Sequence, residues 1–137
     1  MARIEGAHEE NIVRAIHEAW WDTETGRKSS QIFKGQNISV SRLSILSLDE
    51  LFSVFHKELD TSPNGRIVGG GEINVGVLIL IGQNYSSPQV LSVEEDPLPS
   101  NPAHAEIPQK ISRGLANEII KNLRFHLSSS KYTNLIV

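Results

Sequence analysis

The strongest structural signal in the chain lies in the stretch Ser47-Leu48-Asp49-Glu50-Leu51-Phe52-Ser53-Val54-Phe55-His56-Lys57-Glu58-Leu59. Its large apolar side chains recur at the spacing of one helix face, at Leu48, Leu51, Phe52, Phe55 and Leu59. The first four residues form a capping-box pattern, in which the Ser47 hydroxyl and the Glu50 carboxylate each accept a hydrogen bond from the other's backbone N–H. The sequence therefore predicts a helix over about 48–59, which ends before the turn-forming run 61–65.

Segments on both sides of this helix have the composition of strands. Residues 66–68 and 73–81 predict two strands joined by a flexible Gly69-Gly70-Gly71 connection, and the second is apolar enough to be a central strand covered on both faces. Residues 38–43 alternate in polarity, which is typical of an edge strand or of a strand near a functional surface. Shorter strands are predicted at 30–34 and 89–94. Residues 104–107 are read as a short strand or as the lead-in to a helix.

Two more helices are expected near the ends of the chain. Residues 6–21 place apolar side chains at helical spacing, and residues 108–127 do so with Pro108 in the first turn and cations in the last. Residues 128–137 are expected to form a tail, of which 132–137 is apolar and forms either a last strand or a frayed end. Together these elements predict a single α+β domain over 1–137, with a central mixed sheet of about four or five strands and two or three packed helices.

Composition narrows the classes of function. The chain has 137 residues, with 13 Lys and Arg against 16 Asp and Glu, and this acidic balance argues against a dedicated nucleic-acid binder. The absence of cysteine excludes disulfides, thiol nucleophiles and cysteine-ligated metals. The first residues lack an apolar signal-peptide core, and the longest apolar run, 75–81, is far shorter than the ~20 residues of a membrane helix. We therefore expect a cytoplasmic protein without membrane contact.

The segment His104-Ala105-Glu106 is the first candidate for chemistry. It matches half of the zinc deaminase signature, but the other half of that signature consists of cysteines. The five histidines do not form H-E-x-x-H or another close two-histidine metal spacing, so neither a metal nor a cofactor is predicted. His104 and Glu106 would share one side of a strand, which allows them to cooperate as acid and base.

Two further features are candidates for recognition. Adjacent residues on a helix point about 100° apart, so one of Trp20 and Trp21 is expected to anchor the core while the other is exposed as a binding anchor; the alternative is that both are buried. The acidic, proline-rich loop 94–102 could pair with a basic partner. Nucleic-acid binding would need four cations on one face, namely Arg27, Lys28, Lys34 and Arg42.

Three segments resemble a family of small, mostly uncharacterised prokaryotic proteins. Residues 29–34 match its S-S-x-x-F-K segment, residues 38–40 match L-S-V with Ile38 in place of Leu, and residues 96–107 match D-P-L-P-x-N-P-A-H-A-x-[IV]. The resemblance implies a compact standalone domain, and more specifically an accessory protein of a CRISPR-guided protease system (type III-E). It implies no activity. A shared surface would be formed by Phe33, Ser39, Asn101, His104 and Glu106.

The same matches also have a purely structural explanation, in which Asn101 shapes its loop and Phe33 fills the core. Because no set of residues forms a recognisable catalytic motif, we expect a non-enzymatic accessory protein that binds a protein partner in prokaryotic antiviral defence. The alternative is a small enzyme or enzyme subunit that acts on a nucleotide or phosphate substrate, with His104 and Glu106 as acid and base.

Overall fold

Seven strands form one sheet in the computed structural model of the chain, which describes residues 2–3 and 9–128. Their order is β1-β7-β8-β5-β2-β6-β9, and every neighbouring pair is antiparallel. The strands are β1 (Ala2–Arg3), β2 (Asn11–His17), β5 (Ile38–Arg42), β6 (Ile67–Asn74), β7 (Glu94–Glu95), β8 (His104–Ile107) and β9 (Arg124–Leu127). A separate pair consists of β3 (Trp21–Asp22) and β4 (Arg27–Lys28). The predicted α+β class is confirmed, although the sheet is larger than expected and antiparallel throughout.

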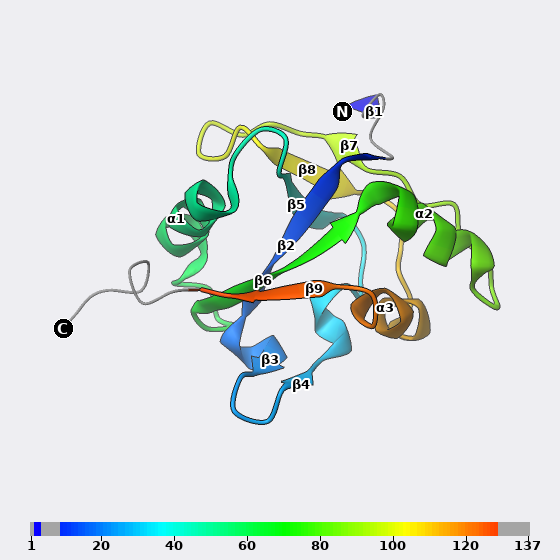
Figure 1. Cartoon of the computed structure of the whole chain (residues 1–137), viewed down its shortest axis with the longest axis horizontal. Coiled ribbons are helices and arrows are strands. Elements are labelled where there is room, and N and C mark those ends of the chain that lie inside the picture. The colour runs from blue at the N-terminus through cyan, green and yellow to red at the C-terminus, as the bar shows by residue number, and fades with distance from the viewer. Residues whose placement is uncertain (1, 4–8, 129–137) are drawn as a thin grey trace.

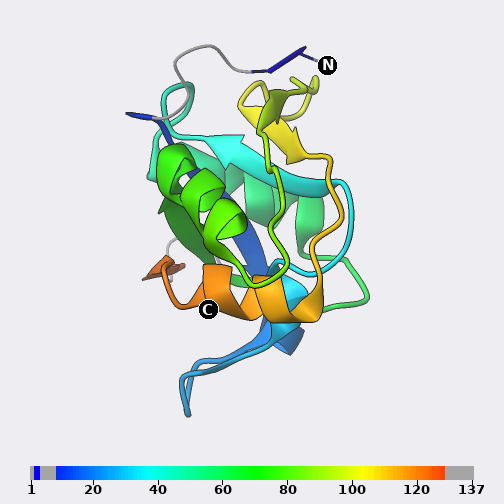
Figure 2. The ribbon, with the colours of Figure 1, turned by 90° about the vertical axis from the view of Figure 1, so that its right-hand side faces the viewer.

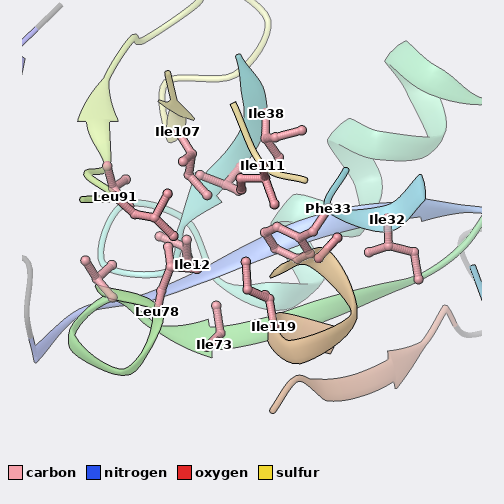
Figure 3. Packing of buried hydrophobic residues seen from close by; sticks show 14 of the residues in the cluster. Ile12, Ile32, Phe33, Ile38, Ile73, Leu78, Leu91, Ile107, Ile111 and Ile119 are labelled. Carbon is pink, nitrogen blue, oxygen red and sulfur yellow. The ribbon is translucent and has the colours of Figure 1, made fainter. Parts of the chain in front are cut away.

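Helices cover both faces of this sheet. Helix α1 (Leu48–Leu59) packs on one face, whereas α2 (Val75–Asn84) and α3 (Arg113–Ile120) pack on the other (Figures 1 and 2). Alternate residues of β2 therefore enter two different cores: Val13 packs with the apolar face of α1, while Ile12 belongs to the larger core. Figure 3 shows this larger core, in which Phe33 lies close to Ile119. No helix in the described part of the chain is long and apolar enough to cross a membrane.

The predicted helix over 48–59 is confirmed as α1. The Ser47 hydroxyl accepts from the Glu50 N–H at 3.2 Å, and the Glu50 carboxylate accepts from the Ser47 N–H at 3.0 Å, so the capping box is complete. Strands β5 and β8 also confirm the strands predicted at 38–43 and 104–107.

The two strands predicted around Gly69-Gly70-Gly71 are wrong. All three glycines lie inside the single strand β6, which runs between β2 and β9. A Cβ on Gly70 would lie 2.7 Å from Cγ1 of Val13, so this position has no room for a side chain. The central strand predicted over 73–81 is wrong as well, because the Asn74 side chain accepts from the Val77 N–H at 3.1 Å and starts helix α2.

The helix predicted over 6–21 is wrong over the described residues 9–21; residues 4–8 lie outside the described part of the chain. Residues 11–17 form β2, followed by the 3₁₀ turn η2 (Glu18–Trp20) and by β3. The apolar residues of β2 are buried on both faces of the sheet, so their spacing does not distinguish a helix from a central strand.

The predicted helix over 108–127 divides into two elements. Pro108 lies before the helix, in an extended segment where Ile111 forms a bridge with Gly35. Helix α3 begins only after Ser112. The Ser112 hydroxyl caps the helix by accepting from the Leu115 N–H at 3.2 Å. A turn at 121–122 ends α3 and leads into β9. Residues 30–32 form the 3₁₀ turn η3 (Ser30–Ile32) instead of the predicted strand. The strand predicted at 89–94 is wrong over residues 89–93, which form no strand, and only Glu94 belongs to β7. The predicted tail beyond residue 128 lies outside the described residues.

Candidate functional site

Polar side chains gather where β5 and β8 run beside each other on the face of the sheet that carries α1. Ser39 pairs with Glu106 and Ser41 pairs with His104, while their neighbours Val40 and Ala105 point into the larger core on the other face. The apolar side of α1 packs instead with residues of β2 and β6. The polar pair of strands is therefore left partly uncovered beside the helix.

A cavity of about 180 Å³ opens between these strands, α1 and the loop that follows β7. We call it the β5–β8 cleft. Its walls are formed by Val13, Arg14, Ala15, Ser39, Val40, Ser41, Val54, Phe55, Glu58, Leu59, Leu98, Ser100, Asn101 and His104. Pockets for drug-sized ligands and cofactors usually measure about 300–1,000 Å³, so this cleft fits one side chain or one chain end.

His104 is held in a fixed orientation in this cleft by hydrogen bonds at both ring nitrogens. Its Nδ1 lies 2.9 Å from the backbone oxygen of Asp96 and 3.4 Å from the Asp96 carboxylate, while Nε2 lies 3.1 Å from the Ser39 hydroxyl. A carbonyl oxygen only accepts, so Nδ1 carries a proton and donates to Asp96, while Nε2 lies within hydrogen-bond distance of the Ser39 hydroxyl. The imidazole is 13% exposed and keeps a face toward the cleft.

Asn101 fixes the loop wall of the cleft. Its side-chain Nδ2 donates to the Ser41 hydroxyl at 3.0 Å, and its Oδ1 accepts from the Ala103 N–H at 3.0 Å. Two backbone hydrogen bonds of 3.0 Å join Leu98 and Asn101 in both directions. Together with the prolines of this segment, these bonds give the cleft a preformed wall.

Arg14 lies on β2 at the base of the cleft, but its side chain leaves the strand on the same face as Ile12 and Ile16, toward the larger core. The guanidinium donates from Nε to the Ile32 carbonyl at 2.8 Å and from Nη1 to the Ser39 carbonyl at 2.9 Å, and it lies 5.2 Å from the centre of the Trp20 ring. Burial lowers the pKa of Arg14 to about 10, which still leaves the group charged at neutral pH.

The structure brings together four of the residues singled out from the sequence and separates the other three. Ser39, Asn101 and His104 line the cleft, and Glu106 lies next to it on β8. The other three lie elsewhere, at Trp20, Trp21 and Phe33.

The aromatic residues belong mainly to the core. Phe33 is fully buried, and Trp21 is 8% exposed and packs against Phe125 with 5.2 Å between ring centroids. Trp20 is half-buried and contacts the His17 ring edge-on at 4.8 Å. Neither tryptophan lies in an α-helix, because the chain turns from strand to 3₁₀ helix to strand at this point.

Two of the four cations considered for nucleic-acid binding, Lys28 and Arg42, make contacts within the protein. Arg42 forms ion pairs with Glu10 at 2.9 Å and with Glu95 at 3.6 Å. The ammonium of Lys28 lies 4.3 Å from the Phe125 ring centre.

Burial opposes ionisation of Glu10, but hydrogen bonds from Arg42 and Ser44 outweigh it and hold the pKa of Glu10 below its usual value.

Sequence reasoning missed Ser41 as a member of the site, and it named Asp96 only as part of an acidic loop, not as the partner of His104. Ser41 follows Ser39 by two residues on a strand, so the alternation of β5 was sufficient to predict it. Asp96 follows β7, and the pairing of β7 with β8 brings it beside His104. Within residues 2–3 and 9–128, no group of three His, Asp or Glu side chains is arranged to hold a metal ion.

A comparison of this chain with protein-family models, with curated proteins and with solved structures finds no match.

Proposed function

We propose that this protein is a non-enzymatic accessory protein that binds a protein partner through the β5–β8 cleft. The observation that carries this proposal is the joint orientation of Ser39, Asn101 and His104 around an open, largely apolar cavity. Binding sites of this kind combine apolar walls with a few fixed polar groups, which give orientation and specificity. Hydrogen bonds hold these polar groups before any partner arrives, so little ordering entropy is lost on binding.

The cleft has the size of a recognition pocket for one residue of a partner. A volume of about 180 Å³ accommodates an anchoring side chain, and a buried anchor in a pocket is how a few residues dominate a protein interface. The resemblance to small prokaryotic proteins extends this proposal to a cytoplasmic accessory role in antiviral defence, with the CRISPR-guided protease systems as the first place to look for the partner.

Site-specific photo-crosslinking in cells tests this proposal. Leu98 is 40% exposed on the rim of the cleft, whereas Val90 is 74% exposed and does not line it, so the two positions form a matched pair for a photoreactive phenylalanine. We expect a specific crosslinked protein from position 98 and none from position 90. Crosslinking from position 90 alone, or from neither position, contradicts the proposal.

A second candidate function is hydrolysis with Ser39 as nucleophile. Asp96, His104 and Ser39 are connected in the order carboxylate, imidazole and hydroxyl, and the proton on Nδ1 leaves Nε2 free to take the Ser39 proton. The sequence suggested His104 and Glu106 as acid and base, whereas this candidate combines His104 with Asp96 and with Ser39 as nucleophile.

The surroundings of Ser39 favour binding over hydrolysis. An acyl-transfer site needs backbone N–H groups that stabilise the oxyanion. The residues after Ser39 lie in the sheet, where Val40 pairs with Ala105 and Ser41 pairs with His104. A fluorophosphonate probe distinguishes the two candidates: binding alone predicts no label on Ser39, and stoichiometric labelling that is lost in His104→Ala identifies a hydrolase.

A further inference from the structure

Two carboxylates border the β5–β8 cleft without a cation beside them. Glu58 lines the cleft from α1, about one helical turn after Val54, which lines it as well, so both belong to the side of the helix that borders the cleft. Glu106 follows His104 by two residues on β8 and therefore lies on the same face of the sheet. Within residues 9–128, no Lys, Arg or His nitrogen lies within 4.0 Å of either carboxylate.

The cations of the neighbouring strands belong to the other face of the sheet. Arg14 leaves β2 on the same side as Ile12, and Arg42 of β5 is the register partner of Ile12, so both side chains start toward the larger core. Arg42 is also paired already, with Glu10 and Glu95. The charge of the cleft border is therefore left for a cation from outside the described part of the chain.

The walls of the cleft suit the hydrocarbon part of a long basic side chain. Phe55 and Leu59 line it from α1, and Leu98 lines it from the opposite loop. Long basic side chains bury their methylene groups along such apolar surface and keep the charged end at polar groups. The hydroxyls of Ser39 and Ser41 add oxygen acceptors to those of the carboxylates.

We propose that the β5–β8 cleft binds an arginine side chain of the partner protein, with its hydrocarbon stem against Phe55, Leu59 and Leu98 and its guanidinium at Glu58. This inference rests on the proposed function and specifies which kind of residue enters the cleft.

The chemistry of the cleft favours arginine over other occupants. A guanidinium carries five N–H donors and is more weakly hydrated than the ammonium of lysine, so it loses less on entering a largely apolar cavity. An acidic side chain would meet the like charge of Glu58, and a purely apolar one would remove water from this carboxylate without replacing it. The chain as a whole also attracts a basic partner, because its 16 Asp and Glu exceed its 13 Lys and Arg.

Two small probes that differ in charge test this assignment on the folded wild-type protein. N-acetyl-arginine amide carries the guanidinium, and N-acetyl-citrulline amide has nearly the same shape without the charge. Dissociation constants from NMR titration, followed on the signals of His104 and Leu98, are expected to favour the arginine derivative by roughly fivefold at low salt, the upper range for an accessible ion pair. High salt is expected to reduce this preference. Equal or tighter binding of the citrulline derivative at low salt overturns the assignment, as does a preference that salt leaves unchanged.

A pair of charge-matched variants locates the guanidinium. Glu58→Gln removes the carboxylate on the helix wall, whereas Glu24→Gln removes the same charge from the turn between β3 and β4, which does not line the cleft. Both residues are exposed, so neither substitution is expected to disturb the fold. Glu58→Gln is expected to bring the two probes to nearly equal affinity, and Glu24→Gln is expected to keep the wild-type preference. An undiminished preference in Glu58→Gln overturns the assignment, and so do equal losses in both variants, because these would reflect only the net charge of the protein.

These results are separable from those of the crosslinking experiment. A partner that crosslinks to position 98 while the probes show no preference for the guanidinium refutes the arginine assignment and leaves the proposed function in place. The absence of any crosslink at position 98 refutes the proposed function, whatever the probes show.

Discussion

Phe33 and Glu10 are two residues with well-defined environments and opposite chemistry. Phe33 lies in the larger core, fully buried among isoleucines from β5, α3 and the segments that connect them (Figure 3). Glu10 lies beside β5, where it accepts two hydrogen bonds from Arg42 and a third from Ser44. Phe33 therefore contributes through packing, whereas Glu10 contributes through an ionised state that depends on pH.

Replacing Phe33 by alanine is expected to destabilise the fold strongly. The substitution removes a fully buried ring and leaves a cavity, which typically lowers the free energy of unfolding by about 3–5 kcal/mol. Val90→Ala is the control, because this exposed side chain is expected to change the free energy of unfolding by less than about 0.5 kcal/mol. Urea denaturation followed by circular dichroism measures both, and a loss of less than about 1 kcal/mol in Phe33→Ala would contradict the burial of this ring.

Glu10→Gln is expected to make the protein less sensitive to acid. The pKa of Glu10 is lower in the folded protein than its usual value of 4.5, so the folded state binds fewer protons at this group than the unfolded state. The resulting stabilisation is complete above about pH 4.5 and is lost as the pH falls through the lowered folded pKa. The stability difference between wild type and Glu10→Gln is therefore expected to be largest at neutral pH and to shrink below pH 4.5. A difference that is constant from pH 7 to pH 3 would show that Glu10 is not held ionised by Arg42.

At the scale of elements, β6 shows what the sequence could and could not predict. Its three glycines resemble a flexible connection in the sequence, but in the structure they lie inside a strand, and a Cβ on any of them would come within 3.0 Å of a neighbouring atom. The apolar run that follows has no clear period, so it is equally consistent with a buried strand and with the observed α2. Helix α1 was predictable because one of its faces is polar and its first turn carries a capping box.

Gly69 and Gly71 of β6 are expected to respond differently to alanine. A Cβ on Gly69 would collide with the backbone oxygen of His126, which cannot move without disturbing β9, whereas the atom nearest to a Cβ on Gly71 would be Cδ1 of the Leu123 side chain at 2.8 Å. We expect Gly69→Ala to lower the free energy of unfolding by roughly 1–3 kcal/mol, and Gly71→Ala to lower it by less, because the Leu123 side chain can move. Amide hydrogen exchange in β9 is expected to accelerate in Gly69→Ala, and equal effects of the two substitutions would contradict the pairing of β6 with β9.

For the molecule as a whole, part of the site was predictable and part was not. Ser39, Asn101, His104 and Glu106 were found through the resemblance, and the structure places them together although they come from β5, β8 and the loop before β8. The course of β2 across the base of the cleft was not predictable, because the pattern of this segment was assigned to a helix. The long-range pairing of strands, which local periodicity does not encode, assembles the cleft.

The most direct test of the cleft as the partner-binding site compares two histidine variants in the crosslinking experiment at position 98. His104 lines the cleft, while His126 lies on β9 and forms its hydrogen bond with Glu72. His104→Ala is expected to reduce the crosslinking yield about fivefold, as the loss of roughly one hydrogen bond requires, whereas His126→Ala leaves it unchanged. Equal yields in the two variants, with both proteins folded, would contradict the assignment of the β5–β8 cleft as the site where the partner binds.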